Sequence, residues 1–264
     1  MDVELIRGRA VLWSEIERLA VEMATREPFL RHMLDETVLS HETPAQIVGA
    51  ALSRRLGSGR MQEATLAALV VETLGEDHAV LEFLEADLVA VATDDPACRS
   101  SLHALLNFKG FHALQSHRVA HSLWKRGRHD VAHWLSNHAS ATLGVDIHPA
   151  VPIGKGVVLD HGTGIVIGET AVVENDVSIL QGVTLGATGK QRGDRHPKVR
   201  RGAMLGAGAK ILGNVEIGCM SRIGAGSVVV TAVPPYCTVA GVPAKVVRTR
   251  MPNRVKSAGE SAPA

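Results

Sequence analysis

The stretch Val145-Asp-Ile-His-Pro-Ala-Val-Pro-Ile153 opens a run in which an aliphatic residue recurs at intervals of six, with two interruptions, as far as Val229. A small or β-branched residue, or a proline, stands two positions before each of these. Side chains two apart face the same side of a strand, so each hexad is one short strand with two inward residues. Hairpin strands would instead require polar turn pairs and variable spacing. The repeat therefore predicts a parallel β-helix. The repeated positions are Ile147, Ile153, Leu159, Ile167, Val173, Ile179, Leu185, Val199, Leu205, Ile211, Ile217, Ile223 and Val229.

The two interruptions of this rhythm mark a candidate site. The first adds two residues before Ile167 and enlarges a corner that reads Asp160-His-Gly-Thr-Gly164. If three hexads close one coil, the corner one coil earlier lies beside Asp146, so the geometry predicts that His161 lies near Asp146. The second is a polar and basic excursion from Thr188 to His196. An acid, a histidine and a cationic loop on one rigid scaffold indicate a functional site.

The composition is that of an ordinary soluble protein. Of the 264 residues, 45% are hydrophobic and 21% charged, and the net charge of +1 gives no reason to expect nucleic acid or a membrane surface as partner. No apolar run reaches the length of a membrane span, and the start Met1-Asp-Val-Glu4 does not resemble a secretory leader. Cys98, Cys219 and Cys237 share no metal-binding spacing. A reduced, cytoplasmic location is expected.

The first part of the chain, residues 1–141, is predicted to be an all-helical domain, because its apolar residues recur at helical spacing. Thr43-Pro44 and Asp94-Asp95-Pro96 are both interpreted as helix starts. A helical domain of this size beside a solenoid usually caps it or joins subunits. The expected helices cover residues 10–25, a stretch from Pro44, residues 62–91 with a break near Gly75, and residues 101–109, 112–125 and 130–141.

The predicted fold class is therefore α+β: the helical domain, then a β-helix over residues 142–247, then a tail over residues 248–264. An irregular turn is expected at Ala240–Lys245, after the rhythm ends at Pro234-Pro235. The tail is polar and rich in small residues, so it is predicted to be disordered.

Two histidine pairs in the helical part, His117 with His121 and His129 with His133, have the four-residue spacing that can hold a metal. No acidic residue at ligand spacing accompanies either pair. They are interpreted as packing or solvated histidines, and no metal is expected.

With these residues assembled, the chain resembles the serine acetyltransferases of cysteine biosynthesis. Hexapeptides alone would specify only the wider acyltransferase superfamily, whereas the Asp-Ile-His-Pro and Gly-Asp-Arg-His-Pro segments are more specific. The motifs that carry the resemblance are Lys109–Gln115, Val145–Ala150, Leu159–Ile165, Gly168–Val172, Gly193–Lys198 and Gly241–Lys245.

The resemblance implies a left-handed β-helix and a homotrimer, with two trimers usually joined through the helical domains. It also implies transfer of acetyl from acetyl-CoA to the hydroxyl of L-serine, giving O-acetyl-L-serine and CoA. A serine hydroxyl is a weak nucleophile and needs a base. His161 suits that role because a neutral imidazole is available near neutral pH, and Asp146 would stabilise the imidazolium. Without the resemblance, His161 could equally be a hydrogen-bonding turn residue.

The resemblance also assigns the binding residues. Asp95 and Asp160 match positions that hold the ammonium of the amino acid, and Arg195 and His196 match those that hold its carboxylate. The arginine fork can bind both carboxylate oxygens. From the residues alone, a helix cap before Pro96 is the favoured interpretation of Asp95. The positions that resemble the CoA contacts of the family are Gly186, Ala187, Thr188, Gly189, Ala207 and Lys245.

Three alternatives remain open. One is a β-helix O-acetyltransferase that uses CoA but acts on a different small hydroxylated acceptor. Another is a metal-dependent enzyme such as a carbonic anhydrase, with His148, His161 and His196 as ligands. The third is a non-catalytic scaffold, which would not need Asp146 and His161 to face each other.

The end of the chain bears on one further partner. Many members of this family bind O-acetylserine sulfhydrylase through a C-terminal tail that ends in isoleucine, whereas this chain ends in Ala264. Alanine buries less apolar area than isoleucine, a difference of about 2 kcal/mol. A tight complex with the sulfhydrylase is therefore not expected.

Overall fold

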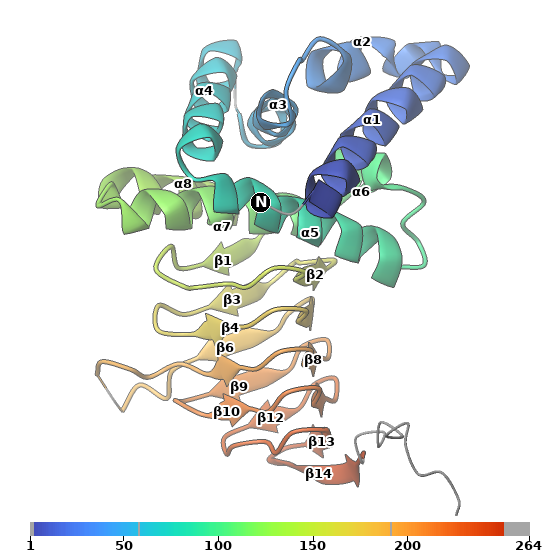
Figure 1. Ribbon diagram of the computed structural model, residues 1–264. Helices are drawn as coiled ribbons and strands as arrows, with labels where there is room; N and C mark the ends of the chain where they lie inside the picture. The colour runs from blue at the N-terminus through green and yellow to red at the C-terminus, as the bar shows by residue number, and fades with distance from the viewer. Residues whose placement is uncertain (1–2, 58, 191, 251–264) are drawn as a thin grey trace, which may run out of the picture.

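The computed structural model describes residues 3–57, 59–190 and 192–250. Helices lie across one end of a prism of short strands, and the chain runs from the helices down the prism (Figure 1). The predicted α+β class is therefore confirmed. Residues 251–264, including Ala264, lie outside the described residues.

The helical part begins with the long helix α1 (Val3–Arg26) and ends with α8 (His129–Leu143). A single turn of 3₁₀-helix, η1 (Pro28–Leu30), and a π-helical turn, η2 (Asp35–Leu39), flank α2. The predicted start at Thr43 is confirmed as a capping box, since the Thr43 hydroxyl accepts from Gln46 N at 3.3 Å. The remaining helices are α2 (Arg31–Leu34), α3 (Pro44–Leu56), α4 (Arg60–Glu76), α5 (His78–Asp94), α6 (Ser101–Asn107) and α7 (Lys109–Lys125).

One expectation for the helices is confirmed and one needs correction. The helical pattern over residues 62–91 is interrupted near Gly75 as expected, at Asp77 between α4 and α5. Asp95 does not start a helix: it follows α5, and its Oδ1 accepts from Ala97 N at 2.8 Å. This local turn competes with helix initiation. Helix α6 starts only after Ser100, whose hydroxyl accepts from His103 N at 3.1 Å.

The strands of the β-helix are two to six residues long and form three sheets, one on each side of the prism. One sheet has the order β1-β3-β6-β9-β12, the second β10-β7-β4 and the third β14-β13-β11-β8-β5-β2. The strands are β1 (Val145–Ile147), β2 (Val158–Asp160), β3 (Ile165–Ile167), β4 (Val172–Val173), β5 (Ser178–Leu180), β6 (Thr184–Gly186), β7 (Lys198–Val199), β8 (Met204–Leu205), β9 (Lys210–Leu212), β10 (Glu216–Ile217), β11 (Arg222–Ile223), β12 (Val228–Val229), β13 (Cys237–Gly241) and β14 (Ala244–Thr249).

The register confirms both interruptions of the repeat. Val166 pairs with Thr184, 18 residues on, as three hexads require. Asp146 pairs with Val166, 20 residues on, so the corner between β2 and β3 holds the two extra residues. Thr184 pairs with Lys210, 26 residues on, so the excursion adds eight residues and leaves the stack undisturbed. In Figure 1 this excursion projects sideways from the prism. All thirteen predicted aliphatic positions are buried.

The β-helix continues past the point where the repeat was expected to end. Val233 bridges to Ile217 and β13 pairs with β11, so the last coil, which begins with β12, is completed by two further sides after Val229. Ala240–Lys245 is not an irregular turn, because it contains the end of β13 and the start of the antiparallel strand β14. An antiparallel strand at this position covers the edge of β13 that a further coil would otherwise occupy. The strand β14 continues to Thr249, two residues past the predicted boundary.

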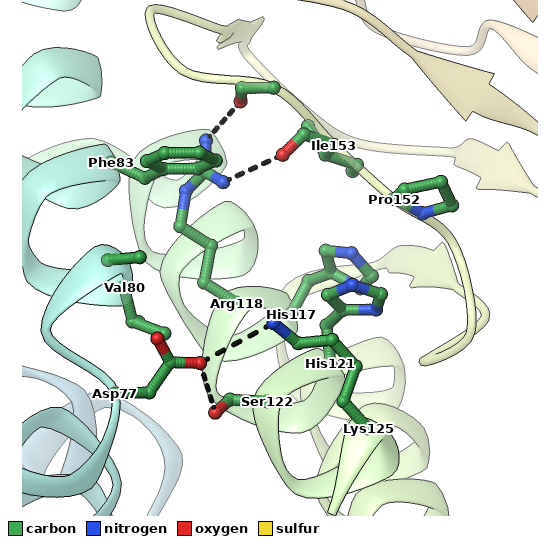
Figure 2. A pocket seen from close by; sticks show the side chains of 12 residues that line it. Asp77, Val80, Phe83, His117, Arg118, His121, Ser122, Lys125, Pro152 and Ile153 are labelled. Atoms are coloured by element: carbon green, nitrogen blue, oxygen red, sulfur yellow. Dashed lines mark hydrogen bonds and ion pairs between the residues drawn. The ribbon is translucent and has the colours of Figure 1, made fainter.

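The two parts are joined through Arg118 of α7. Its guanidinium donates to Asp87 of α5 at 2.6 and 2.9 Å. It also donates to the carbonyl oxygens of Ile153 at 3.1 Å and Gly154 at 2.6 Å in the first coil. The Phe83 ring lies 5.1 Å from the guanidinium carbon. Figure 2 shows Arg118 crossing from the helix to these carbonyls beside a cavity of about 300 Å³. A buried cation thus fixes the helices on the first coil.

Candidate functional site

A depression of about 500 Å³ lies between α8, the first two coils and the returning end of the excursion. It brings together Asp146, Arg195 and His196, three of the predicted site residues. Its lining is His133, Ser136, Asn137, Asp146, Ile147, His148, Pro149, Val166, Ile167, Gly168, Glu169, Arg195 and His196.

Arg195 is held by an acid that the sequence interpretation did not single out. Its Nη2 donates to Glu169 Oε2 at 2.6 Å and its Nη1 to the carbonyl oxygen of Gly193 at 3.0 Å. The hydrogen bond from Arg195 lowers the pKa of Glu169 below its ordinary value. The guanidinium is therefore oriented at the rim of the depression. Glu169 lies in the motif Gly168–Val172, one of the motifs that carry the family resemblance.

His196 is buried, with 6% of its surface exposed. Its Nδ1 lies 2.9 Å from the Thr170 hydroxyl and 3.2 Å from Thr170 N. Burial lowers the pKa of His196, and the neighbouring Arg195 lowers it further. His196 is therefore a neutral ring that Thr170 holds through Nδ1 and that lines the depression.

The histidines beside the depression pack against an aromatic ring. Trp124 stacks on His129 at 4.2 Å between ring centroids and meets His133 and His148 edge-on at 5.1 and 5.4 Å. Deeper in the helical part, His117 Nε2 and His121 Nδ1 lie 3.0 and 2.8 Å from the carbonyl oxygens of Val151 and Pro149. The packing interpretation of both pairs is confirmed. Across the described ranges, no cluster of three or more His, Cys, Asp or Glu side chains has a metal-binding arrangement.

The corner that carries His161 lies on a different edge of the prism. His161 has a left-handed backbone, with φ of 55°, and its side chain is 75% exposed. Its Nε2 lies 3.8 Å from Asp160 Oδ1. Helix α7 approaches this corner so closely that a Cβ on Gly110 would lie 1.8 Å from the carbonyl oxygen of Leu159. The corner is thus supported from behind while His161 is open to solvent.

Asp146 and His161 are not in contact. Asp146 lies on β1 opposite Val166, whereas His161 lies on the corner before β3. Among the described residues the two side chains form no ion pair within 4.0 Å. The two chain segments are nevertheless adjacent, because Gly164 N donates to the carbonyl oxygen of Gly144 at 2.7 Å.

Asp95 does not reach the depression, since it lies in the turn after α5. Arg195 and His196 lie on the edge between β3 and β4, whereas Asp160 and His161 lie on the edge between β2 and β3. The structure therefore does not gather the predicted serine-binding residues within one chain.

The predicted CoA positions are also spread along the prism. Gly186 ends β6, and Thr188 helps to line a shallow second cavity of about 640 Å³, with Arg192, Asp194, Asn214 and Val230. Ala207 lies at the corner before β9, where its carbonyl oxygen accepts from Gly226 N at 2.8 Å. Lys245 lies on β14, opposite Ala240. Neither Ala207 nor Lys245 lines that cavity.

Comparison with known proteins decides the family. The family described as serine acetyltransferase, N-terminal, matches residues 12–116. The serine acetyltransferase of Escherichia coli (strain K12) is 50% identical over 237 residues, which cover 90% of this chain and 87% of that protein. This chain belongs to the serine acetyltransferase family.

Solved structures of the family agree over most of the chain. The Neisseria gonorrhoeae serine acetyltransferase in complex with serine has a TM-score of 0.86 at 49% identity and covers 89% of this chain and 96% of its own. The Brucella abortus strain S19 serine acetyltransferase in complex with coenzyme A has a TM-score of 0.87 at 45% identity, with coverage of 89% and 94%. The resemblance stated from the sequence is confirmed, and the fold is the left-handed parallel β-helix of this family.

Proposed function

We infer that this chain is a serine O-acetyltransferase, which transfers acetyl from acetyl-CoA to the hydroxyl of L-serine and releases O-acetyl-L-serine and CoA. The observation that carries the inference is the 50% identity with the Escherichia coli enzyme over 90% of the chain. Solved relatives with serine bound and with coenzyme A bound support the two substrates.

His161 acts as the general base. Its exposed ring can approach a bound hydroxyl, and a neutral imidazole can take the proton as the oxygen attacks the thioester carbon. No nucleophile of the protein is needed, because the two substrates react directly once they are held together. Asp160 Oδ1 lies 3.8 Å from His161 Nε2, so the negative charge of this carboxylate stabilises the imidazolium that forms. Asp146 is proposed as the orienting acid.

The charged ends of serine define the binding residues. Arg195 and His196 hold the carboxylate, because a fork of N–H donors and a neutral ring N–H both suit it. Asp95 and Asp160 hold the ammonium.

These two groups occupy different edges of the prism, so the site is completed when the edge of one chain meets the edge of another. This arrangement supports a homotrimer built around the β-helices. We propose that two such trimers join through the helical domains.

Acetyl-CoA lies along the side of the prism, where small residues admit its pantetheine arm. The residues proposed to contact it are Gly186, Ala187, Thr188, Gly189, Ala207 and Lys245. We place the reaction in the cytoplasm, and the three cysteines, which are free thiols in the structure, are consistent with that compartment. The described helices include none with the length and apolar character of a membrane span.

The test is release of the CoA thiol with purified protein, acetyl-CoA and L-serine. L-Threonine, L-homoserine and a hexose serve as competing acceptors of different shape. Release with L-serine at a kcat/KM at least about tenfold above the other acceptors is expected. A hexose lacks both charged ends, L-threonine adds a methyl group beside the hydroxyl, and L-homoserine carries its hydroxyl one carbon further away. Equal or faster release with another acceptor would overturn the assignment in favour of a different hydroxylated substrate.

A further inference from the structure

The corner Gly168-Glu-Thr-Ala171 joins β3 to β4 and lies beneath the returning end of the excursion. Three polar contacts converge there on one hydroxyl. Thr170 Oγ1 accepts from Arg195 N at 3.0 Å and from His196 N at 3.1 Å, and it lies 2.9 Å from His196 Nδ1. Thr170 is therefore one of the residues that attach the excursion to the prism, beside Glu169, which binds Arg195.

The hydrogen bonds of this hydroxyl determine the tautomer of His196. A hydroxyl has two lone pairs and one hydrogen, and the two peptide N–H groups occupy both lone pairs. Its hydrogen is shared between Nδ1 and the Asp194 carboxylate, which also accepts from the Thr170 side chain. Thr170 N–H, which has no such choice, donates to Nδ1 at 3.2 Å. Nδ1 is therefore an acceptor without a hydrogen, so the neutral ring carries its hydrogen on Nε2.

Gly168 determines where that ring lies. A Cβ at Gly168 would lie 2.0 Å from Nε2 and 2.2 Å from Cδ2 of His196. The imidazole thus rests against the bare Cα of Gly168, in space that any larger residue would fill. The φ angle of Gly168 is not positive, so its requirement for glycine is one of space and not of backbone conformation.

The Nε2 edge of the ring is left for a ligand. Nε2 has no hydrogen-bond partner among the described residues, and His196 lines the depression with Arg195. A donor N–H and a guanidinium side by side suit one carboxylate.

We propose that Thr170 and Gly168 are positioning residues for substrate recognition: Thr170 holds His196 as the Nε2–H tautomer, Gly168 gives its ring the necessary space, and together they aim the N–H at the carboxylate of the acceptor amino acid. The identity of that acceptor rests on the proposed function, whereas the tautomer does not.

The decisive variants are Thr170→Val, which keeps the shape and removes the hydroxyl, and Thr170→Ser, which keeps the hydroxyl. In Thr170→Val the KM for serine should rise about tenfold, as for loss of a well-placed hydrogen bond, with the KM for acetyl-CoA unchanged within about twofold. Thr170→Ser should stay within about threefold of the parent. Thr238→Val, an equal change in β13 at the far end of the prism, is the matched control and should change neither constant.

Gly168→Ala tests the second part independently, because it moves the ring and leaves the hydroxyl in place. It too should raise the KM for serine and leave that for acetyl-CoA unchanged. An unchanged KM for serine in both Thr170→Val and Gly168→Ala would overturn the proposal, as would a Thr170→Ser variant as impaired as Thr170→Val. A general loss of folding would lower the apparent kcat, because fewer molecules are active, and would leave both KM values unchanged. It is therefore distinguished from a selective rise in the KM for serine.

The tautomer can be measured without any substrate. In a long-range ¹H–¹⁵N spectrum of protein labelled at histidine, with the His196 signals identified by their loss in His196→Gln, Nδ1 should appear as an unprotonated nitrogen. A hydrogen on Nδ1 in the parent protein would refute the role of Thr170. If the parent protein fails to acetylate serine, the proposed function falls, and this measurement still decides the tautomer.

Discussion

The pair of Arg118 with Asp87 gives the sharpest prediction about stability. Only 5% of the Arg118 side chain and none of the Asp87 side chain is exposed. Replacement of Arg118 by Met removes the cation and its bonds to the first coil, and leaves the carboxylate buried with Gln115 and Val157 N as its other donors. Burial raises the pKa of Asp87 and Arg118 lowers it, so loss of the arginine favours uptake of a proton.

Removal of one partner from a buried ion pair costs about 3–5 kcal/mol of the free energy of unfolding. For a chain of this size that corresponds to a fall in Tm of roughly 6–20 °C. The matched control is Arg201 with Asp176, whose Nε and Oδ2 lie 2.8 Å apart, close to the 2.6 Å of the buried pair. Their side chains are 71% and 50% exposed, so Arg201→Met should cost at most about 1 kcal/mol.

The assay is thermal unfolding of both variants at equal protein concentration, because association of subunits also shifts Tm. The double variant Arg118→Met with Asp87→Asn should recover a large part of the loss, since the buried charge is then removed. Similar falls in Tm for Arg118→Met and Arg201→Met, or no recovery in the double variant, would refute the reasoning that burial of the charge sets the cost.

Three further predictions concern the reaction and the pH dependence of folding. His161→Ala should lower kcat by about 10²–10⁴-fold while coenzyme A still binds in a direct titration; near-normal turnover would exclude His161 as the base. Arg195→Ala and Asp95→Ala should raise the KM for serine, and a rise confined to the KM for acetyl-CoA would contradict their roles. Burial lowers the pKa of His117 to about 3 and that of His112 to about 4. The unfolded chain binds these protons near pH 6.5 and the folded chain does not, so the free energy of unfolding should fall as the pH drops from 6.5 towards 4, by up to about 1.4 kcal/mol per pH unit for each histidine. Urea unfolding across that range checks this, and His117→Gln should show a shallower slope; an identical slope would exclude His117 as a contributor.

The sequence by itself determined the β-helix and its register. The repeat is local, because the side chain of each residue alternates between the inside and the outside of its own short strand. Insertions in such a stack therefore change the register by the number of residues added, and the 20- and 26-residue registers follow from counting. The motifs at His161 and at Arg195-His196 could likewise be recognised from the chain alone.

Only the tertiary structure decided which side chains hold the site in place. The contacts of Glu169 with Arg195 and of Thr170 with His196 join residues 26 apart, across the excursion. The length of the excursion indicates that it leaves the stack. Where Arg195 and His196 rejoin the prism is determined by their contacts with Glu169 and Thr170, which a local sequence pattern does not predict. The same holds for Arg118, since its partner Asp87 is one of many acids in an amphipathic helix and is distinguished only by the burial that packing imposes.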